Sequence, residues 1–512
     1  MADVSRSDRS RLPCVVGVAT HTYRGLDAPE PLDMWVEMLR AAAADAGAPG
    51  ALEHADSVAT TYCQTWQYDD PLGRLTEALH IEPRRTRYMT IGGTSGQQLV
   101  NDAAERILRG EADIVAIASA EALATQAAAR KRGERRNYRF KPEERRPFPF
   151  EAPLHEGELA HDLMSALNAF ALFDSARRAH RGTALDDYRS QLATMLSGLT
   201  RVAATNPEAW FAIERSADDI ATPRADNRMA AYPYTKYMAA VMDVDMAAAL
   251  LVMSNEAADR LGVAHDRRVT VRGWCFAKDP TYIAEHRSLH HSPAMRAASR
   301  EALRIAGTSV DDVAHFDLYS CFGASLNFAC DALGIDPLDP RGLSVTGGLP
   351  YHGGPASGYM THAIAEMVRR LRDDPGAYGL TSGVGMINTK HVFGVYSVKP
   401  GHLEPPDERA IQELLDADGV ATVAGSKEMI ESTPQPATVV AYTVVHDRDQ
   451  QPRAAPLVVD LADGRRAYAA VLDPDVLERI EREEFVGANV TLEPHAFAGP
   501  AGELPGLRAR LR

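Results

Sequence analysis

The sequence contains few cysteines, and their positions exclude two classes of cysteine-dependent protein. The 512 residues include five cysteines, which are scattered and show no CxxC spacing: Cys14, Cys63, Cys275, Cys321 and Cys330. A zinc ribbon needs closely spaced ligand pairs, and a disulfide framework needs an even set of cysteines in a short chain. We therefore expect reduced thiols, most of them in the core.

Long apolar runs are also missing. The longest, such as Met246–Met253, fall far short of the roughly 20 residues that cross a bilayer. The segment Met1–Pro13 is polar and lacks the apolar centre of a secretory signal. We expect a cytoplasmic protein with no membrane span.

Positive charge is scarce relative to negative charge. Lys and Arg total 55 and Asp and Glu total 70, which gives a formal net charge of −15. Such a balance argues against a general binder of nucleic acids or membrane surfaces. Any anion that the protein binds must meet a local basic patch.

Short apolar runs alternate with amphipathic segments, which is typical of α/β proteins with parallel-rich sheets. A strand at Pro13–Thr20 and a helix at Met34–Ala46 are followed by a strand at Ala55–Thr60. A helix at Met295–Ala306 and a strand at Val313–Tyr319 repeat this order. The sequence predicts two similar layered halves.

A second pair of segments supports the duplication. Each begins with a Gly-Gly pair and continues with a helix and a strand: Gly92-Gly93, Gln97–Arg109 and Ile114–Ala118 in the first half, and Gly353-Gly354, Tyr359–Arg372 and Tyr378–Thr381 in the second.

An inserted segment and an appended domain complete the predicted organisation. The insertion, residues 120–232, contains helical patterns near Leu159–Arg181 and Leu185–Ala204 and is expected to cover a site. After the Pro/Gly-rich linker at 400–406, alternating residues predict a β-rich domain. The predicted domains are 10–265, 266–400 and 406–512, the last of them barrel-like.

The glycine-rich segment Ile91–Gly96 precedes a helix, so its amides are able to hold a phosphate or an oxyanion. It lacks the Walker lysine and the dinucleotide spacing, and a tight strand-to-helix turn explains its glycines equally well. Local sequence leaves both readings open.

Three segments resemble motifs of the thiolase superfamily over about residues 10–400. Gly93–Gly96 with the following helix resembles the nucleophile turn, Asp317–Phe322 the Asn-Glu-Ala-Phe or His-Asp-Cys-Phe segment, and Gly347–Pro355 the Gly-Gly then Gly-His-Pro segment. The segments Thr389–His391 and Gly394–Ser397 resemble the actinobacterial thiolase-like proteins of type 1, which carry an extra C-terminal domain. This resemblance implies a duplicated fold with αβαβα layers.

The resemblance also implies an acyltransferase superfamily, acetyl-CoA acetyltransferase-like, of lipid, fatty-acid or steroid metabolism. The catalytic positions depart from it: Gly93 stands at the acyl-accepting cysteine, Gly354 at the activating histidine, and Thr381–Gly383 at the second cysteine. Without a thiolate there is no covalent acyl enzyme, and Ser95 needs an adjacent base to replace it. We expect classical thiolase activity to be absent.

Five proton-transfer groups remain near the inferred site: Tyr319, Cys321, His362, Lys390 and His391. Related aldolases use tyrosines on hydroxyacyl-CoA, so Tyr319, with Tyr359 as partner, is our candidate acid/base, assisted by His362 or His391. The alternatives are a buried structural role for each group and a non-catalytic CoA-ester binding or scaffold protein.

The resemblance implies coenzyme A or an acyl-CoA as ligand. We expect it to bind between the two glycine turns, at Gly92, Gly93, Ser95, Gly353 and Gly354, with its phosphates on the basic segment 130–146. The candidate arginines in that segment are Arg132, Arg136 and Arg139. A solvated loop is the alternative, and single-stranded nucleic acid has no other support.

The histidines His286, His290 and His291 lack the carboxylates and further ligands of a metal site, so no metal is expected. Both a homodimer, as in thiolases, and a monomer, because of the appended domain, remain open from the sequence.

Overall fold

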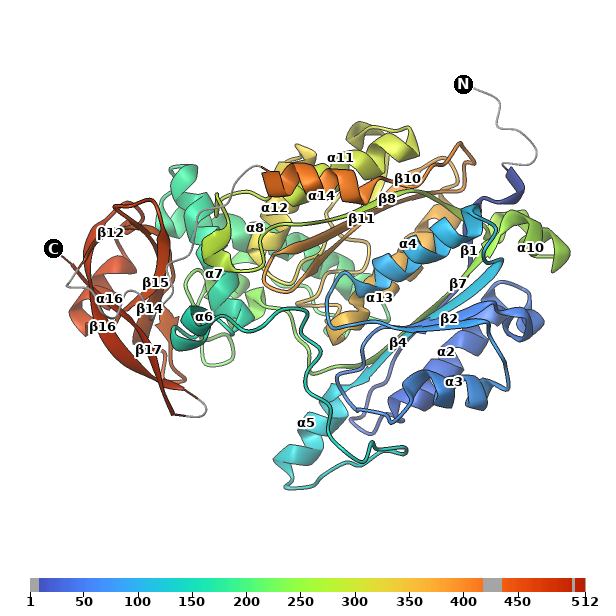
Figure 1. Ribbon diagram of the computed structural model, residues 1–512, viewed down its shortest axis with the longest axis horizontal. Coiled ribbons are helices and arrows are strands. Elements are labelled where there is room, and N and C mark those ends of the chain that lie inside the picture. The colour runs from blue at the N-terminus through green and yellow to red at the C-terminus, as the bar shows by residue number, and fades with distance from the viewer. Residues whose placement is uncertain (1–8, 418–434, 500–501, 512) are drawn as a thin grey trace.

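The computed structural model describes residues 9–417, 435–499 and 502–511; residues 1–8 of the polar N-terminal segment lie outside this range. A large α/β body occupies one side of the molecule and a smaller β-rich domain the other (Figure 1). Within the described residues, none of the helices combines the length and the apolar character that crossing a membrane requires.

Nine strands of the described chain form one sheet in the order β3-β2-β4-β7-β1-β8-β11-β10-β9. The first half contributes five of them and the second half four, so the second half has no counterpart of the edge strand β3. The two halves join narrowly, because β1 and β8 share just the pairs Cys14–Thr270 and Val15–Val269. The strands are β1 (Pro13–Thr22), β2 (Ser57–Thr60), β3 (Arg85–Tyr88), β4 (Ile114–Ala122), β7 (Asp245–Ser254), β8 (Val269–Lys278), β9 (Val313–Asp317), β10 (Tyr378–Gly385) and β11 (Lys390–Ser397).

Helices cover both outer faces and fill the space between the halves. Helix α2 packs on β1, β4 and β7, α11 packs on β8 and β11, and α4 and α13 pack on each other and on strands of both halves. This is the expected αβαβα order. The helices of the body are α2 (Pro31–Asp45), α3 (Pro71–Leu79), α4 (Ser95–Leu108), α10 (Asn255–Arg260), α11 (Pro293–Ala306), α12 (Gly323–Leu333), α13 (Tyr359–Asp373) and α14 (Glu408–Ala417).

The predicted duplication is confirmed by the two central helices. Both follow a glycine turn and precede a strand, β4 after α4 and β10 after α13. They approach closely at Gly96, where a Cβ atom would lie 2.9 Å from Met360 Cβ and from the amide nitrogen of Thr361. The close approach explains why this helix begins with a glycine in its first turn.

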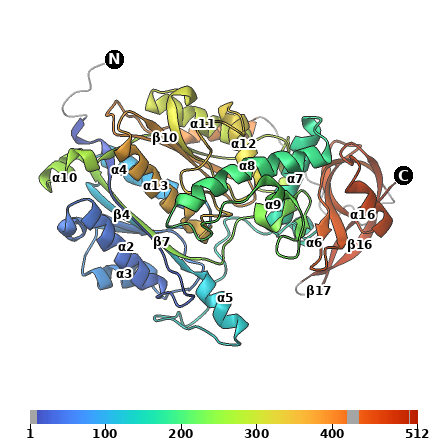
Figure 2. The ribbon, with the colours of Figure 1, turned by 180° about the vertical axis from the view of Figure 1, so that it is seen from behind.

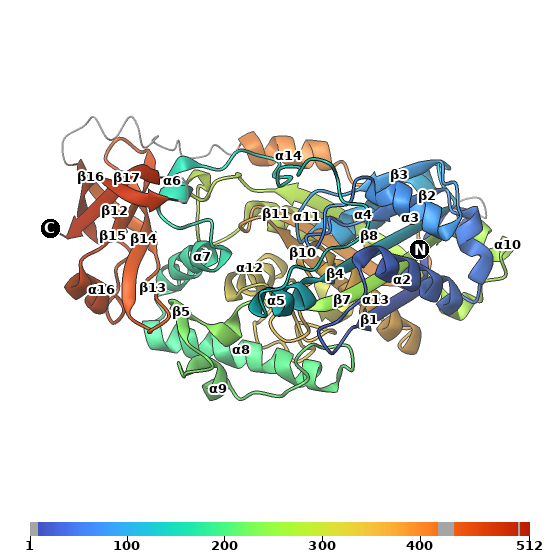
Figure 3. The ribbon, with the colours of Figure 1, turned by 90° about the horizontal axis from the view of Figure 1, so that it is seen from below.

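The insertion differs from its prediction in structure. The helix predicted at 159–181 begins at Ala166, after the separate short helix α6, and both α6 and α7 pack on strands of the C-terminal domain. Figures 2 and 3 show α7 between the body and that domain, while α8 runs along the body. The elements are α5 (Leu123–Lys131), α6 (Glu156–Ala160), α7 (Ala166–His180), α8 (Leu185–Thr205), α9 (Ala217–Ala221), β5 (Met229–Ala231) and β6 (Tyr234–Thr235).

In the described part of the C-terminal domain, β12, β16, β17, β15 and β14 form a closed ring, because β12 pairs with both β16 and β14. Strand β5 of the insertion extends this sheet through β13, and Tyr232 and Leu185 of the insertion belong to the barrel core. The elements are β12 (Gln435–Tyr442), β13 (Val445–His446), β14 (Pro452–Leu461), β15 (Arg466–Val471), α16 (Pro474–Ile480), β16 (Asn489–Gly499) and β17 (Gly502–Leu511).

Helix α14 was not expected from the sequence, where residues from 406 were given to the β-rich domain. It packs on β8 and α11 of the body. Its side chains Glu408 and Gln412 accept hydrogen bonds of 2.8 and 2.9 Å from the backbone N–H groups of Phe276 and Lys278. The helix therefore belongs structurally to the second half of the α/β body.

Candidate functional site

The turn before α4 meets Tyr319, which follows β9. A Cβ atom built on Gly93 would lie 2.1 Å from Tyr319 Oη and 2.2 Å from the carbonyl oxygen of Val384. Both distances are far below van der Waals contact, so residue 93 has no room for a side chain. The phenol of Tyr319 thus occupies the space that a side chain at position 93 would need.

The buried carboxylate of Asp317 organises the loops around this tyrosine. It accepts hydrogen bonds from Ser344 Oγ (2.8 Å), Thr346 Oγ1 (3.0 Å), Tyr359 Oη (2.9 Å) and two backbone N–H groups of the same loop (3.1 Å each). The rings of Tyr359 and Tyr319 meet edge to face with centroids 5.5 Å apart. Tyr359 is therefore held rigidly, and it limits the positions open to Tyr319.

The hydroxyl of Tyr319 forms no hydrogen bond with any other described residue, although its backbone N–H donates to Ser382 Oγ at 2.9 Å. Burial, and secondarily the nearby Cys321, raises the pKa of Tyr319 above its ordinary value of 10. A role as general base would need a lowered pKa. The environment instead keeps its proton, so the group suits hydrogen-bond donation.

His362 is buried on α13 and is separated from Tyr319 by two rings. Edge-to-face contacts link Tyr319 to Tyr359, Tyr359 to His352 at 6.1 Å, and His352 to His362 at 5.5 Å. Neither ring nitrogen of His362 has a partner in the described chain. Burial lowers the pKa of His362 well below 6.5 and that of His352 to about 3, so both are neutral at pH 7.

His391 does not assist Tyr319, which corrects the sequence-based pairing. Its Nε2 lies 3.0 Å from Asp279 Oδ2, and Asp279 accepts from the amide of Ala294 in the first turn of the outer helix α11. Lys390, its neighbour on β11, points to the opposite face, where its Nζ lies 2.6 Å from Glu151 Oε2. Lys390, which the sequence groups with His391, is therefore the side chain nearer to the glycine turn.

The remaining nucleophile candidates have structural partners. Ser95 Oγ donates to the carbonyl oxygen of Thr90 at 3.1 Å, which fixes the turn. Cys321 Sγ lies 3.1 Å from Ser325 Oγ, and burial raises the pKa of this thiol to about 12. Neither group is arranged as an activated nucleophile.

The two glycine turns face each other, as the sequence resemblance implied. The amide of Gly92 donates to Ser357 Oγ, in the turn after Gly354, at 3.1 Å. A Cβ atom on Gly353 would lie 2.9 Å from Met246 Sδ, and one on Gly354 3.2 Å from Leu349 Cδ2. Packing, rather than an open cleft, surrounds these glycines.

A basic–aromatic cavity of about 490 Å³ lies instead at the carboxyl ends of β2 and β4. Five of its side chains are cationic, and the described residues offer no ion-pair partner to Arg130, Arg135 or Lys141. The basic–aromatic cavity is lined by Tyr62, Gln64, Thr65, Trp66, Gln67, Gln126, Arg130, Arg135, Arg136, Lys141, Pro142, Glu143, Arg145 and Phe148.

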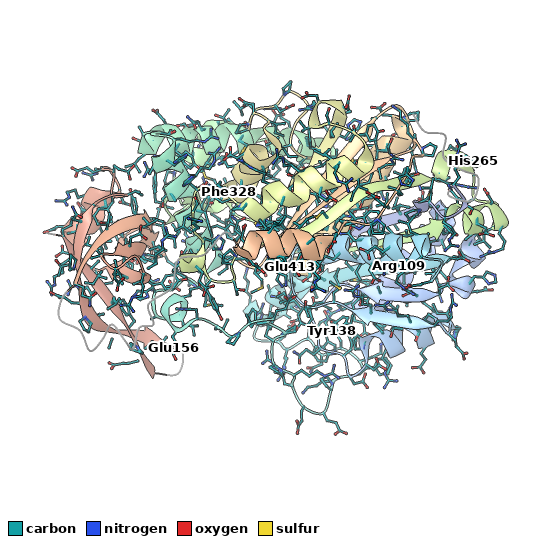
Figure 4. All side chains as sticks on the ribbon, turned by 45° about the horizontal axis from the view of Figure 1, so that its top comes forward. Arg109, Tyr138, Glu156, His265, Phe328 and Glu413 are labelled. Carbon is teal, nitrogen blue, oxygen red and sulfur yellow. The ribbon has the colours of Figure 1, made fainter. Side chains whose placement is uncertain are left out.

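The three arginines selected from the sequence divide between two roles. Arg136 lines the basic–aromatic cavity. Arg132 pairs with Glu134 at 2.8 Å, and Arg139 pairs with Glu30 and contacts Asp33. The aromatic wall, including Trp66, was not predicted, because Trp66 lies far from the basic segment in sequence. Tyr138 of that segment, labelled in Figure 4, packs edge to face on Trp66.

A strap, residues 147–154, connects this cavity with the glycine turn. Phe148 lines the cavity. Glu151 accepts a hydrogen bond of 3.2 Å from Thr90 Oγ1 and pairs with Lys390. The strap thus lies across the path from the cavity to the turn.

Metal binding has no support in the part of the chain that the structure describes, where no group of three or more His, Cys, Asp or Glu side chains is arranged as a ligand set.

Comparisons with known proteins identify the family of this architecture. Residues 411–495 match the model of the thiolase-like protein type 1 additional C-terminal domain. A monomeric SCP2-thiolase-like protein type 1 from Mycobacterium smegmatis is 31% identical, with a TM-score of 0.83 over 98% of this chain and 99% of that one. A comparison with curated proteins finds no match.

Two more distant structures share the fold of the body. An acetyl-CoA acetyltransferase from Syntrophomonas wolfei is 17% identical, with a TM-score of 0.54 over 76% of this chain and 99% of that one. An Ltp2-ChsH2(DUF35) aldolase is 18% identical, with a TM-score of 0.57 over 77% of this chain and 100% of that one. At such identities the likeness concerns the fold alone.

Proposed function

Because the chain belongs to the family of SCP2-thiolase-like proteins of type 1, we propose that it binds coenzyme A thioesters, with their phosphates in the basic–aromatic cavity. The observation that carries the proposal is the set of arginine and lysine side chains without carboxylate partners beside Tyr62, Trp66 and Phe148. Guanidinium groups bind phosphates through paired hydrogen bonds, and aromatic rings stack on adenine. A volume near 490 Å³ falls in the usual range of ligand sites.

The acyl end of such a ligand would lie toward the glycine turn, under the strap. This direction is supported by the contact of Glu151 with Thr90, two residues before Gly92. Transfer through a cysteine-bound acyl group is not part of the proposal, because Gly93 has no room for a side chain. The protein from Mycobacterium smegmatis is described as monomeric, and we propose the same state here.

The test is calorimetric titration with coenzyme A and acetyl-CoA. We expect the double variant Arg130→Gln/Arg135→Gln to bind about tenfold more weakly or worse, because two phosphate contacts are lost. Arg132→Gln is the control for each single substitution, Arg130→Gln and Arg135→Gln: it removes one positive charge from the same segment, but Arg132 already pairs with Glu134. Equal losses in the control and the single variants, or no binding by the unaltered chain, would refute the proposal.

A second function, carbon–carbon cleavage of a β-hydroxyacyl-CoA, is favoured by the unpartnered hydroxyl of Tyr319. In this reaction the β-hydroxyl loses its proton to solvent, the α–β carbon bond breaks, and the β carbon leaves as an aldehyde or ketone. The electrons of the broken bond form the enolate of the shortened thioester, which takes up a proton from solvent at carbon. A protonated Tyr319 suits donation to the thioester oxygen as charge develops. One protein with this fold is described as an aldolase. Mass spectrometry of a hydroxyacyl-CoA panel tests it, and binding without turnover favours a non-catalytic carrier.

A further inference from the structure

A second cavity, which we call the His–Arg pocket, lies between α7, α11 and α12 and has a volume of about 680 Å³. It shares no lining residue with the basic–aromatic cavity. Its polar lining consists of three arginines, three histidines and one aspartate: Arg177, His180, Arg181, His290, His291, Arg296 and Asp331.

The pocket keeps positive charge after its internal ion pairs are formed. The Arg177 guanidinium binds Asp331 with two hydrogen bonds of 2.7 and 3.0 Å, and Arg181 reaches the same carboxylate at 2.5 Å. Arg296, on α11, has no ion-pair partner among the described residues. One carboxylate thus faces three guanidinium groups in a chain whose net charge is −15.

The histidines form a stack in which the tautomers of two rings are coupled through Ser288. The rings of His180 and His290 are nearly parallel, with centroids 3.7 Å apart, and His291 follows at 4.8 Å. Ser288 Oγ lies 2.9 Å from His290 Nδ1 and 3.0 Å from His291 Nδ1. A hydroxyl has one proton, so it donates to one of these nitrogens and accepts from the other. While both rings are neutral, one Nε2 is therefore a donor and the other an acceptor.

We propose that the His–Arg pocket binds a phosphate group, either inorganic phosphate or the terminus of a phosphomonoester. Monohydrogen phosphate offers acceptor oxygens to Arg181 and Arg296 and one hydroxyl proton to the accepting Nε2. Sulfate has the same charge but no proton to donate. A neighbouring cavity of about 590 Å³ shares the Arg177 and Arg181 wall and has room for the organic part of an ester.

Charge around the stack also couples binding to pH. Arg177, Arg181, Arg296 and Asp331 face the histidines from the three helices, and Asp279 influences His291 from behind. Burial and the neighbouring histidines lower the pKa of His290 to about 4. A charged imidazole has no acceptor nitrogen, so the preference for phosphate over sulfate should hold from pH 8 to 6 and be lost as stronger acid charges the rings.

The experiment is calorimetry and ³¹P NMR of the full chain with inorganic phosphate, sulfate and phenyl phosphate. At pH 7.5 we expect saturable phosphate binding that is at least about fivefold tighter than sulfate binding, because one hydrogen bond is lost with sulfate. Arg296→Gln should weaken phosphate binding about tenfold. Arg300→Gln removes an exposed charge one turn further along α11, outside the pocket, and should change it less than about twofold.

Of His290→Leu and His291→Leu, the variant that removes the accepting Nε2 should abolish the preference for phosphate over sulfate, and the unfolding temperature of each shows whether the fold is kept. Tighter binding of phenyl phosphate identifies an ester as ligand, and tighter binding of inorganic phosphate identifies the free ion. Equal effects of Arg296→Gln and Arg300→Gln, or no saturation up to about 10 mM phosphate, would overturn the proposal. The comparison of Arg296→Gln with Arg300→Gln tests the phosphate proposal even if the histidine variants do not fold.

Discussion

The Tyr319 hydroxyl lies where a side chain on residue 93 would begin, 2.1 Å from the Cβ position of Gly93. The large side chain at 319 fills a space between two loops that are 226 positions apart, and the glycine at 93 leaves that space free. Gly93 and Tyr319 therefore depend on each other, because the tyrosine fits where residue 93 has no side chain. A change at either position must be judged together with the other.

This relationship predicts coupled stabilities. Gly93→Ala should lower the free energy of unfolding by about 1–3 kcal/mol, since the methyl group meets Tyr319 Oη and the Val384 carbonyl. In the background of Tyr319→Ala the same substitution should cost less, with a coupling of about 1 kcal/mol, because one obstacle is gone. Gly50→Ala is the control, as a Cβ there meets nothing within 4 Å. Strict additivity in denaturant titrations would contradict the geometry.

Tyr319→Phe should lower turnover and leave stability nearly unchanged, whereas Tyr359→Phe should lower stability. The Tyr319 hydroxyl has no hydrogen-bond partner among the described residues, so its removal should change stability by less than about 0.5 kcal/mol while lowering any hydroxyacyl-CoA turnover about a hundredfold. The Tyr359 hydroxyl binds Asp317 and Thr346, and its loss should cost about 1–3 kcal/mol. Full turnover by Tyr319→Phe would remove Tyr319 from the mechanism.

The cysteines should be unreactive in the folded protein. All five are buried, and burial raises the pKa of Cys14 to about 11 and those of Cys321 and Cys330 to about 12. At pH 7 the thiolate fraction of Cys14 is then about one in ten thousand. Mass spectrometry should find slow alkylation by iodoacetamide in buffer and five modified cysteines in denaturant. Thiolysis of acetoacetyl-CoA that iodoacetamide abolishes would contradict this prediction.

His362 should make the protein sensitive to acid. The folded state keeps this side chain neutral, while the unfolded chain protonates it below its ordinary pKa of 6.5. The free energy of unfolding therefore decreases as the pH falls below about 6.5. The loss from His362 amounts to about 2 kcal/mol at pH 5. His362→Met should lose that much less stability between pH 7 and 5. The exposed His265, labelled in Figure 4, supplies a control variant, His265→Gln, which should follow the parent chain.

The pair between Arg178 of α7 and Glu484 should anchor the C-terminal domain. Its two hydrogen bonds are 2.6 and 2.8 Å long, and the Arg178 side chain is 2% exposed against 44% for Glu484. Glu484→Gln leaves a buried unpaired guanidinium and should cost about 3 kcal/mol. Arg178→Met leaves a carboxylate that water can reach and should cost less. For comparison, Glu413→Gln breaks an exposed pair on α14 and should cost under about 0.5 kcal/mol in calorimetry.

Local pattern was sufficient for much of the secondary structure. The apolar run from Pro13 predicts β1, and the helix expected at 359–372 is α13, because burial on one face imposes a periodicity that is readable within ten to fifteen residues. The helix α14 escaped prediction in a proline-rich region, since its buried contacts are with β8 and α11 rather than within its own segment.

By itself, the sequence determined the α/β class, the duplication and the β-rich end, because composition, period and motif order are properties of the chain alone. The tertiary structure decided what each candidate side chain meets. It turned His391 toward Asp279 and away from Tyr319, and paired Arg139 with Glu30 while Arg136 lines a cavity. These outcomes depend on electrostatic and packing contacts between residues more than a hundred positions apart, and no local pattern encodes which distant partner reaches a given side chain.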